Sequence, residues 1–196
     1  MTDPSAPPDR FDDFLQLSNS SFEDARIVLF YGCSGSGKSS TLDFLARQHA
    51  DFRDRPQCHL RWESFPDRVP EVHSHVVFLD EIRRRRELRL VRRLLRNCNT
   101  VVAATHVAPV WFWPLRRFGK LVAYRTDRDA TKISRYLQRL EIDYSEAVVR
   151  DYCRRYGATF TDVDCILEAW PSCSFDRSFY HFHRHGVIVS EPALGP

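Results

Sequence analysis

A short glycine- and serine-rich segment near the start of the chain has residue types and spacing that favour phosphate chemistry. Residues 32–39 read Gly-Cys-Ser-Gly-Ser-Gly-Lys-Ser and fit the pattern G-x-x-x-x-G-K-[S/T] at every fixed position. The glycines permit backbone angles that other residues resist, so the loop can turn its N–H groups inward as an anion nest. Lys38 is then expected to reach the β- and γ-phosphates of a nucleotide, and the Ser39 hydroxyl to coordinate Mg²⁺. The residues expected to bind the nucleotide are Gly32, Cys33, Ser34, Gly35, Ser36, Gly37, Lys38, Ser39 and Ser40.

The segments on either side of this loop fit the same interpretation. Residues 27–31 form an apolar run that is typical of a buried strand. Residues 41–47 continue as a helix with apolar Leu42, Leu45 and Ala46, and the dipole at the start of such a helix favours an anion. The alternative is a glycine-rich turn that binds no ligand.

A second pair of candidate residues follows another buried run. Residues 76–79 are apolar and lead directly into Asp80 and Glu81. Asp80 is expected to hold Mg²⁺ beside Ser39, and Glu81 to polarise an attacking water. An activated water favours hydrolysis, because a small-molecule kinase excludes water and orients a substrate hydroxyl instead. The alternative is that the two carboxylates only cap the helix that follows.

A third apolar run ends in a hydroxyl and an imidazole. Residues 100–106 read TVVAATH, so that Thr105 and His106 come at the end of a predicted strand. Ligands of open α/β sheets bind at the carboxyl ends of the strands. We expect Thr105 to hydrogen-bond to the γ-phosphate or the attacking water, with His106 as the next candidate. The alternative for Thr105 is a hydroxyl that only caps the strand end.

Strands and helices alternate in the elements that must position these residues. Further strands are predicted at 58–62, 74–81, 100–106 and 120–124, with a helix at 81–97. This alternation predicts an α/β fold, in which helices cover both faces of a mostly parallel five-stranded sheet in three layers. From about residue 127 the pattern becomes helical. The expected N-caps there are Asp127, Ser145 and Thr161, and Gly157 is expected to end the middle helix.

Length and composition bound the remaining possibilities. The 196 residues are 43% hydrophobic, which predicts a globular chain of one domain with a small appendage. A net charge of +3 does not by itself indicate nucleic acid, and no run reaches transmembrane length. The acidic, proline-rich start does not resemble a signal peptide, and six cysteines without a C-x-x-C pair favour reduced thiols in a cytoplasmic protein. The expected parts are a tail and lead-in at 1–24, a nucleotide-binding core at 25–126, a helical lid-like region at 127–171 and a C-terminal extension of unassigned role at 172–196.

These motifs together resemble those of the AAA+ ATPases and related signalling NTPases over roughly residues 20–170. Residues 32–39 match Walker A, VVFLDE at 76–81 matches Walker B, and VVAATH is similar to sensor 1. The resemblance implies a P-loop NTPase fold with a short helical lid and Mg-ATP as ligand. It also implies that Arg116 or Arg117, before the fifth strand, is an arginine finger for a neighbouring subunit. The alternative is an exposed Arg pair that only solvates a helix end.

One part of the chain departs from the family pattern. The family's lid often carries an Arg near the start of its last helix, where it touches the nucleotide. Here residues 157–170 contain Thr161, Asp162 and Asp164 but no basic residue. Contact between lid and nucleotide is therefore either lost or supplied by Arg154 or Arg155.

Three other features have two interpretations each. The predicted helix after Glu81 carries eight Arg residues within 83–96, which indicate either a solvated face or contact with a nucleic-acid backbone or an acidic partner. Trp111, Phe112 and Trp113 indicate core packing or a partner-binding surface. His181, His183 and His185 would share one face of a strand and could bind a metal, although no Cys or carboxylate follows nearby.

The leading hypothesis is an ATP-binding ATPase of AAA+-like type that uses Mg-ATP binding and hydrolysis as a conformational or assembly switch. Its expected catalytic residues are Lys38, Glu81, Thr105 and Arg117, and its expected metal ligands are Ser39 and Asp80. The alternatives are a small-molecule kinase and an ATP-loaded adaptor that recruits a nucleic-acid-processing or other effector. A homo-oligomer or a protein partner is expected, and a membrane is not.

Overall fold

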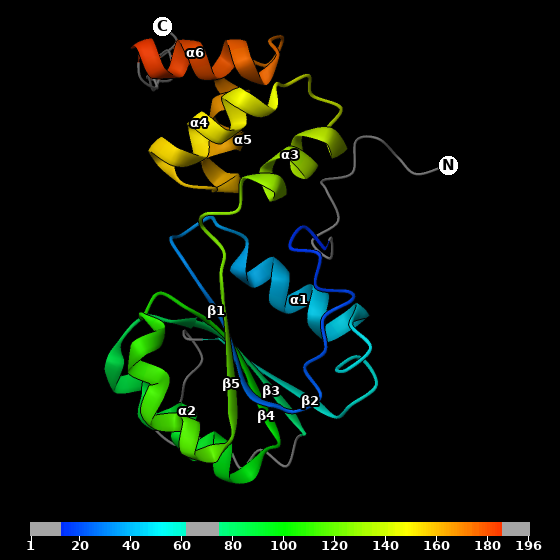
Figure 1. The fold of residues 1–196 in the computed structure, drawn as a ribbon, viewed down its shortest axis with the longest axis vertical. Helices are drawn as coiled ribbons and strands as arrows, with labels where there is room; N and C mark the ends of the chain where they lie inside the picture. The colour runs from blue at the N-terminus through cyan, green and yellow to red at the C-terminus, as the bar shows by residue number, and fades with distance from the viewer. Residues whose placement is uncertain (1–12, 62–74, 186–196) are drawn as a thin grey trace, which may run out of the picture. The chain divides into compact units, whose positions relative to one another are not determined.

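The computed structural model describes residues 13–61 and 75–185 of the chain (Figure 1). It divides into two compact units, residues 1–127 and residues 128–196, and each unit is described by itself. The ends of two predicted strands, Trp62 and Ser74, lie outside the described residues, as do residues 1–12 of the predicted tail and 186–196 of the predicted C-terminal extension.

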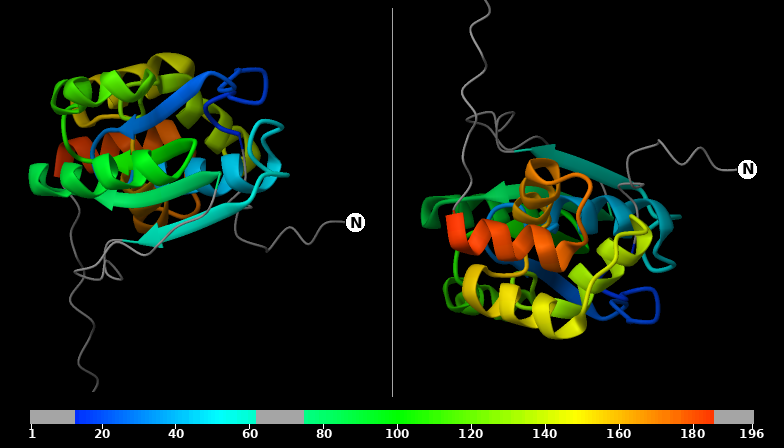
Figure 2. Two further views of the ribbon diagram at one scale, coloured as in Figure 1. Left: turned by 90° about the horizontal axis from the view of Figure 1, so that it is seen from below. Right: turned by 90° about the horizontal axis from the view of Figure 1, so that it is seen from above.

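The first unit contains a five-stranded sheet in which all neighbouring strands run parallel. The strand order is β2-β3-β4-β1-β5, so that β2 lies at an outer edge (Figure 2). The strands are β1 (Ala25–Tyr31), β2 (Gln57–Arg61), β3 (Val76–Ile82), β4 (Thr100–Thr105) and β5 (Lys120–Arg125). The predicted α/β fold and its five strands are therefore confirmed, and all the loops that follow the strands emerge at one edge of the sheet.

Helices cover both faces of this sheet and complete the three layers (Figure 1). Helix α1 (Lys38–Gln48) packs Leu42 and Leu45 against one face, where Val28 also points. Helix α2 (Leu88–Asn97) and the 3-10 helix η3 (Pro109–Phe118) cover the other face, where Leu29 points. Because side chains alternate along a strand, a sheet buried on both faces needs the continuous apolar runs found in this sequence.

The segment after β3 differs from the helix predicted at 81–97. Strand β3 continues to the buried Ile82, a short 3-10 turn η2 spans Arg85–Glu87, and α2 begins only at Leu88. The backbone N–H of Arg83 donates to Glu87 Oε2 at 2.8 Å. The Glu87 side chain thus stabilises a turn ahead of the helix, and the helix start was predicted seven residues too early.

The second unit is a group of four helices, coloured yellow-green to red in Figure 2. They are α3 (Ala130–Arg139), α4 (Glu146–Tyr156), α5 (Phe160–Ala169) and α6 (Phe175–His185). Ser145 precedes α4 and Gly157 follows it with φ 90°, as predicted. The other two predicted N-caps are wrong. Asp129 caps α3 instead of Asp127, whose carboxylate accepts hydrogen bonds elsewhere, and Thr159 precedes α5 instead of Thr161.

The three histidines near the end lie on helix α6 and not on a strand, so that interpretation is wrong. Phe175 and Phe179, four residues apart, are buried on one face of this helix, which is a helical and not a strand period. The His181 and His185 rings stack on each other, whereas the His183 ring stacks on Phe179. Within the described parts of the chain, no group of three or more His, Cys, Asp and Glu side chains is placed to hold a metal ion.

Helix α6 belongs to the core of the second unit. The Phe175 and Phe179 rings lie 5.6 Å, centre to centre, from the ring of the fully buried Tyr152 on α4. The described residues that follow position 171 therefore pack with the helices that precede it.

All six cysteines are free thiols. Of the helices in the described ranges, none is both long and apolar enough to cross a membrane.

Candidate nucleotide-binding site

The glycine-rich loop connects the end of β1 to the start of α1, as its sequence predicted. Gly37 precedes the helix with φ 87°, a left-handed conformation that suits glycine, and as the N-cap residue it has no side chain with which to cap the first turn of α1. Lys38 is only 6% exposed, and its ammonium donates to the carbonyl oxygens of Gly32 at 3.0 Å and Cys33 at 2.6 Å. The cation therefore lies inside the curve of the loop, where an anion would meet it together with the helix N-terminus.

Burial also affects the charge on Lys38. Loss of hydration lowers its pKa below the ordinary value of 10.5, and the acidic groups Cys33, Asp80 and Asp127 oppose the effect. Because desolvation outweighs these acidic groups, the charge on the ammonium is only partly compensated, and an anionic ligand would be favoured here.

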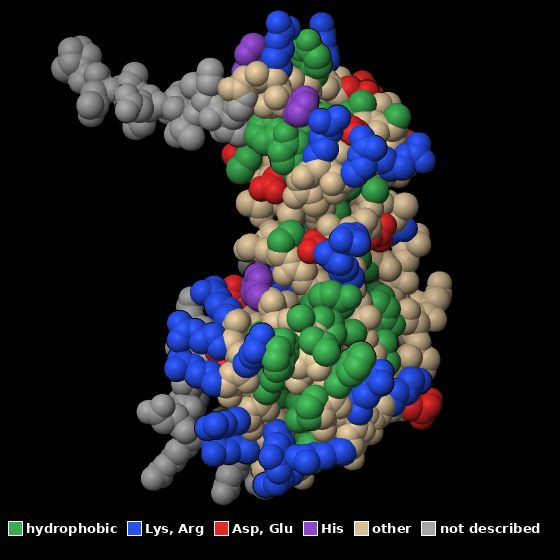
Figure 3. All heavy atoms as spheres, turned by 60° about the vertical axis from the view of Figure 1, so that its left-hand side comes forward, with side chains coloured by type: hydrophobic (Ala, Val, Ile, Leu, Met, Phe, Trp, Pro, Cys, Tyr) green, Lys and Arg blue, Asp and Glu red, His purple; other side chains and the backbone are tan. Residues whose placement is uncertain are grey.

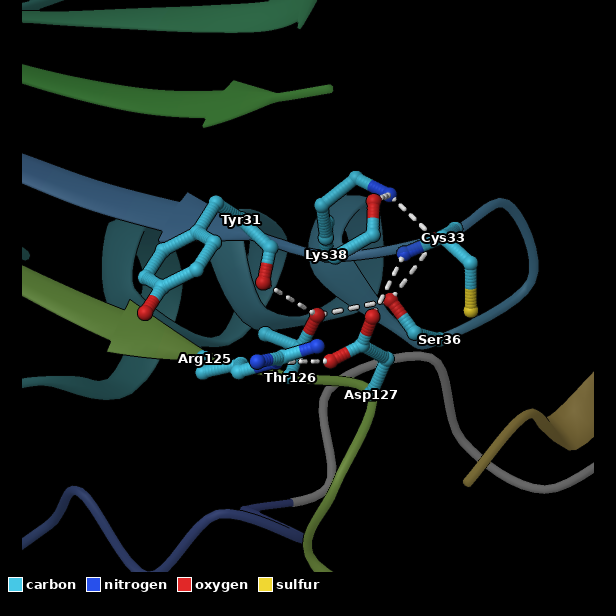
Figure 4. A network of polar contacts seen from close by, with 8 residues as sticks. Tyr31, Cys33, Ser36, Lys38, Arg125, Thr126 and Asp127 are labelled. Atoms are coloured by element: carbon cyan, nitrogen blue, oxygen red, sulfur yellow. Dashed lines mark hydrogen bonds and ion pairs between the residues drawn. The ribbon is translucent and has the colours of Figure 1, made fainter. Parts of the chain in front are cut away.

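Two residues that follow β5 hold the loop from outside (Figure 4). The Thr126 hydroxyl lies 2.6 Å from Ser36 Oγ and donates to Tyr31 O at 3.2 Å. Asp127 accepts from the backbone N–H of Cys33 at 3.3 Å and from Arg125 Nε at 2.6 Å. Neither side chain was predicted from the sequence to lie at the site. Their place at the end of a strand beside β1 was the signal that could have found them.

The position of Thr126 also explains why residue 32 is a glycine. A Cβ atom built on Gly32 would come within 2.6 Å of Thr126 Oγ1, closer than side chains approach one another. The first glycine of the motif thus permits the close approach of loop and strand β5, in addition to its conformational freedom.

Ser39 and Asp80 meet across the sheet edge. Ser39 Oγ donates to Asp80 Oδ1 at 2.9 Å, although the two residues are 41 positions apart in the sequence. Hydroxyl and carboxylate oxygens are the ligands that Mg²⁺ prefers, and Mg²⁺ is often held by one carboxylate together with substrate phosphates. The pair therefore fits a magnesium ion bound with a nucleotide. Of the other expected loop residues, Ser34 is exposed and Ser40 is half-buried.

Glu81 has an unusual backbone conformation. Its φ is +65°, and the pairing of β3 with β4 shifts register between Leu79 and Ile82. A non-glycine residue in the left-handed region is uncommon and marks local strain, which is often found at functional sites. The partly exposed Glu81 carboxylate accepts a hydrogen bond from Arg83 Nη2 at 2.6 Å. The candidate base therefore lies beside Asp80 and is held by an ion pair.

Thr105 and His106, at the end of β4, differ in exposure and in hydrogen bonding. Thr105 is fully buried, and its hydroxyl donates to Ile82 O at 3.0 Å and accepts from the Val107 N–H at 2.9 Å. The His106 side chain is exposed, and its pKa lies below 6.5, mainly through partial burial and secondly through the nearby Lys38 cation. Both Glu81 and Asp80 act on the same imidazole in the opposite direction, so His106 lies within electrostatic reach of the loop and the acidic pair.

The candidate arginines lie outside this cluster of contacts. Arg116 and Arg117 are exposed on the last turn of η3, ahead of β5, and their guanidinium groups lie near the Trp113 and Phe118 rings. In the second unit, Arg154 and Arg155 both pair with Asp151.

Comparison with known proteins places the fold. No known protein family and no curated protein matches this sequence. A solved structure of DnaA from Aquifex aeolicus, bound to AMPPCP, is 14% identical with a TM-score of 0.55, over 87% of this chain and 63% of that chain. A RuvB variant from Thermotoga maritima is also 14% identical, with a TM-score of 0.52 over 90% of this chain and 69% of that chain.

These likenesses define the class of fold. DnaA and RuvB are AAA+ P-loop ATPases, and this chain has the α/β fold of their AAA+ domains, as the sequence resemblance implied. The chain spans less than two thirds of the DnaA chain.

Proposed function

We propose that this chain binds Mg-ATP and hydrolyses it, in the manner of an AAA+ ATPase whose nucleotide cycle switches its conformation or assembly. The observation that carries the proposal is the hydrogen bond between Ser39 and Asp80. It joins the end of the phosphate loop to the strand that carries Glu81, so the residues for phosphate, metal and water lie at one edge of the sheet.

Each residue then has a distinct part in the proposed reaction. Lys38 and the N–H groups at the start of α1 bind the phosphates, while Ser39 and Asp80 hold Mg²⁺, which neutralises phosphate charge when bound. Glu81 accepts the proton of the attacking water. His106 senses the γ-phosphate, because its imidazole is exposed beside Lys38, whereas the proton of Thr105 is already donated to Ile82 O. Arg117 remains the proposed finger toward a neighbouring subunit.

The test separates binding from hydrolysis. Lys38→Ala should abolish the Mg-ATP binding that isothermal titration detects in the wild type. Glu81→Gln should bind Mg-ATP normally but release phosphate at least roughly 100-fold more slowly, which is the usual effect of losing a general base. Glu168→Gln, a change at an exposed acid of the second unit, is the matched control and should leave both unchanged. A wild-type rate of phosphate release in Glu81→Gln would show that Glu81 is not the general base.

A small-molecule kinase is the second candidate, and one cavity favours it. A cavity of about 300 Å³ adjoins Ser39 and Asp80 and includes polar side chains of Asp43, His59 and Arg61 in its lining. Such a volume could admit an acceptor molecule. Parallel assays of ADP and inorganic phosphate decide between the candidates, since hydrolysis forms both in equal amounts. Excess ADP in the presence of small metabolites would favour phosphate transfer.

A further inference from the structure

Charge is distributed unevenly along the chain. Residues 82–126 hold 12 of the 29 Lys and Arg residues but only one of the 26 Asp and Glu residues. That acid, Glu87, is 5% exposed and accepts a hydrogen bond from the Arg83 N–H. The small net charge of the protein therefore conceals a strongly basic segment, which would attract a polyanion.

Helix α2 presents part of this charge as a stripe. Arg89, Arg92 and Arg96 occur at helical spacing and are exposed, while Val91 and Leu95 face the core. The stripe from Arg89 to Arg96 is about 10 Å long at 1.5 Å per residue. None of the three forms an ion pair with another residue in the described ranges. The guanidinium groups are thus available to phosphates.

Two exposed indole rings lie on η3, which covers the same face of the sheet as α2. Trp111 is 41% exposed and Trp113 is 56% exposed, whereas Phe112 between them is fully buried. The Arg85 guanidinium carbon lies 3.3 Å from the centre of the Trp111 ring, which ties the turn ahead of α2 to η3. Figure 3 shows a face of the first unit on which Lys and Arg side chains surround exposed hydrophobic side chains.

We infer that this surface binds a single strand of nucleic acid. The Arg–Trp surface consists of Arg85, Arg89, Arg92, Arg96, Trp111 and Trp113. Guanidinium groups bind the phosphates, and the indole rings stack on unpaired bases. A duplex stacks its bases on each other, so backbone contact with a duplex would need the arginines but not two exposed tryptophans. The inference goes beyond the proposed ATPase and does not depend on it, because the surface needs no nucleotide to bind.

Binding is measured by fluorescence anisotropy with labelled oligonucleotides and the full chain. Labelled dT20 and U20 should bind within a few-fold of each other, because the contacts use phosphates and base faces. A 20-base-pair duplex should bind at least roughly 10-fold more weakly than dT20, since its base faces are unavailable. Saturating dT20 should also quench the intrinsic tryptophan fluorescence of the wild type, a readout that requires no variant.

Two sets of variants separate the charge from the rings. Arg89→Gln/Arg92→Gln/Arg96→Gln should weaken dT20 binding by roughly 10-fold or more. The same variant should also reduce the steepness of the plot of log K against log salt concentration by about two, because each lost phosphate contact contributes about 0.7 to that slope. Arg150→Gln/Arg177→Gln/Arg184→Gln removes the same charge from exposed sites of the second unit and should change binding far less. Trp113→Ala should weaken dT20 about 5-fold or more without changing the salt dependence, and Trp113→Phe should restore most of the affinity.

Several results would overturn the inference. Equal or tighter binding of the duplex, with no effect of Trp113→Ala, would mean that the surface contacts only a backbone. Binding of polyglutamate but of neither single strand would mean that its partner is an acidic protein. Equal losses in the two triple-Gln variants would mean that only the overall charge matters.

Discussion

The side chain of Asp127 shows how a single residue can connect the phosphate loop to the sheet. Burial alone would raise the pKa of this carboxyl group, but the hydrogen bonds from Arg125 and from the Cys33 N–H outweigh burial and hold it below 3.8. Asp127 thus stays ionised and keeps the loop tied to the end of β5 at neutral pH. The hydrogen bond between Cys33 and Asp127 connects positions 94 residues apart. The Asp127 carboxylate therefore holds part of the anion-binding loop in place before any ligand binds.

Asp127→Asn should make this connection measurable. The amide oxygen can still accept from Cys33, but the ion pair with Arg125 is lost, so the free energy of unfolding should fall by roughly 0.5–1 kcal/mol at pH 7. A lowered carboxyl pKa stabilises the folded state above the unfolded value of 3.8, and this stability is lost as the pH falls through the lower folded-state pKa. Urea unfolding should therefore show that Asp127→Asn has a smaller free energy of unfolding than the wild type from pH 7 down to about pH 4. At lower pH the two free energies should become equal. Asp24→Asn, at an exposed position, is the control.

Arg83 is the second single residue with a testable role. Its guanidinium binds a Glu81 oxygen at 2.6 Å and so restrains the proposed base. Arg83→Ala should free the carboxylate and raise the rate of ATP hydrolysis about 2- to 5-fold, the equivalent of an exposed ion pair. The KM for ATP should not change, and neighbouring Arg84→Ala should have no effect. A lower rate in Arg83→Ala would instead mean that Arg83 itself assists the reaction.

Among the elements, helix α6 has the clearest structural role. Phe175 is fully buried on α6, against the Tyr152 ring of α4. Tyr180 on the same helix is 57% exposed. The two aromatic residues therefore form a matched pair for a test of how far α6 supports the second unit.

Phe175→Ala should destabilise the second unit by about 3–5 kcal/mol, the usual cost of removing a buried phenyl ring. Hydrogen exchange followed by mass spectrometry should show faster exchange of α4 and α5 amides in this variant. Tyr180→Ala should leave their exchange close to that of the wild type. Equal exchange in Phe175→Ala and the wild type would show that α4 and α5 are stable without this contact.

The sequence predicted the elements better than it predicted their ends. Strand runs such as 27–31 and the motif at 32–39 depend on local composition, so the sheet and the loop could be predicted. The start of α2 depends on how Glu87 bonds back to Arg83, and the histidines of α6 were assigned to a strand because two-residue spacing outweighed the period of Phe175 and Phe179. Thr126 was missed because its partner Ser36 is 90 residues away.

At the scale of the whole molecule, hydrolysis is useful only if it changes something outside the site. Arg116 and Arg117 are exposed at the end of η3, which leads into β5, an outer strand of the sheet. Side chains at an outer edge can contact a second copy of the chain. We therefore propose that this edge delivers a guanidinium to the γ-phosphate of a neighbour, where such a group can accelerate hydrolysis by about 10³-fold or more.

Mixing two inactive variants tests whether the arginine pair acts between copies. Arg116→Ala/Arg117→Ala should bind Mg-ATP but hydrolyse it slowly, and Lys38→Ala should supply the arginines but bind no nucleotide. A mixture of the two should recover phosphate release that neither has alone, and the rate of the wild type should rise more than linearly with protein concentration. Light scattering of Glu81→Gln with Mg-ATP should detect an assembly larger than the monomer. If the double Arg variant hydrolyses ATP at the wild-type rate, or if the mixture stays inactive while the wild type is active, the arginine pair does not act between copies and only solvates the end of η3.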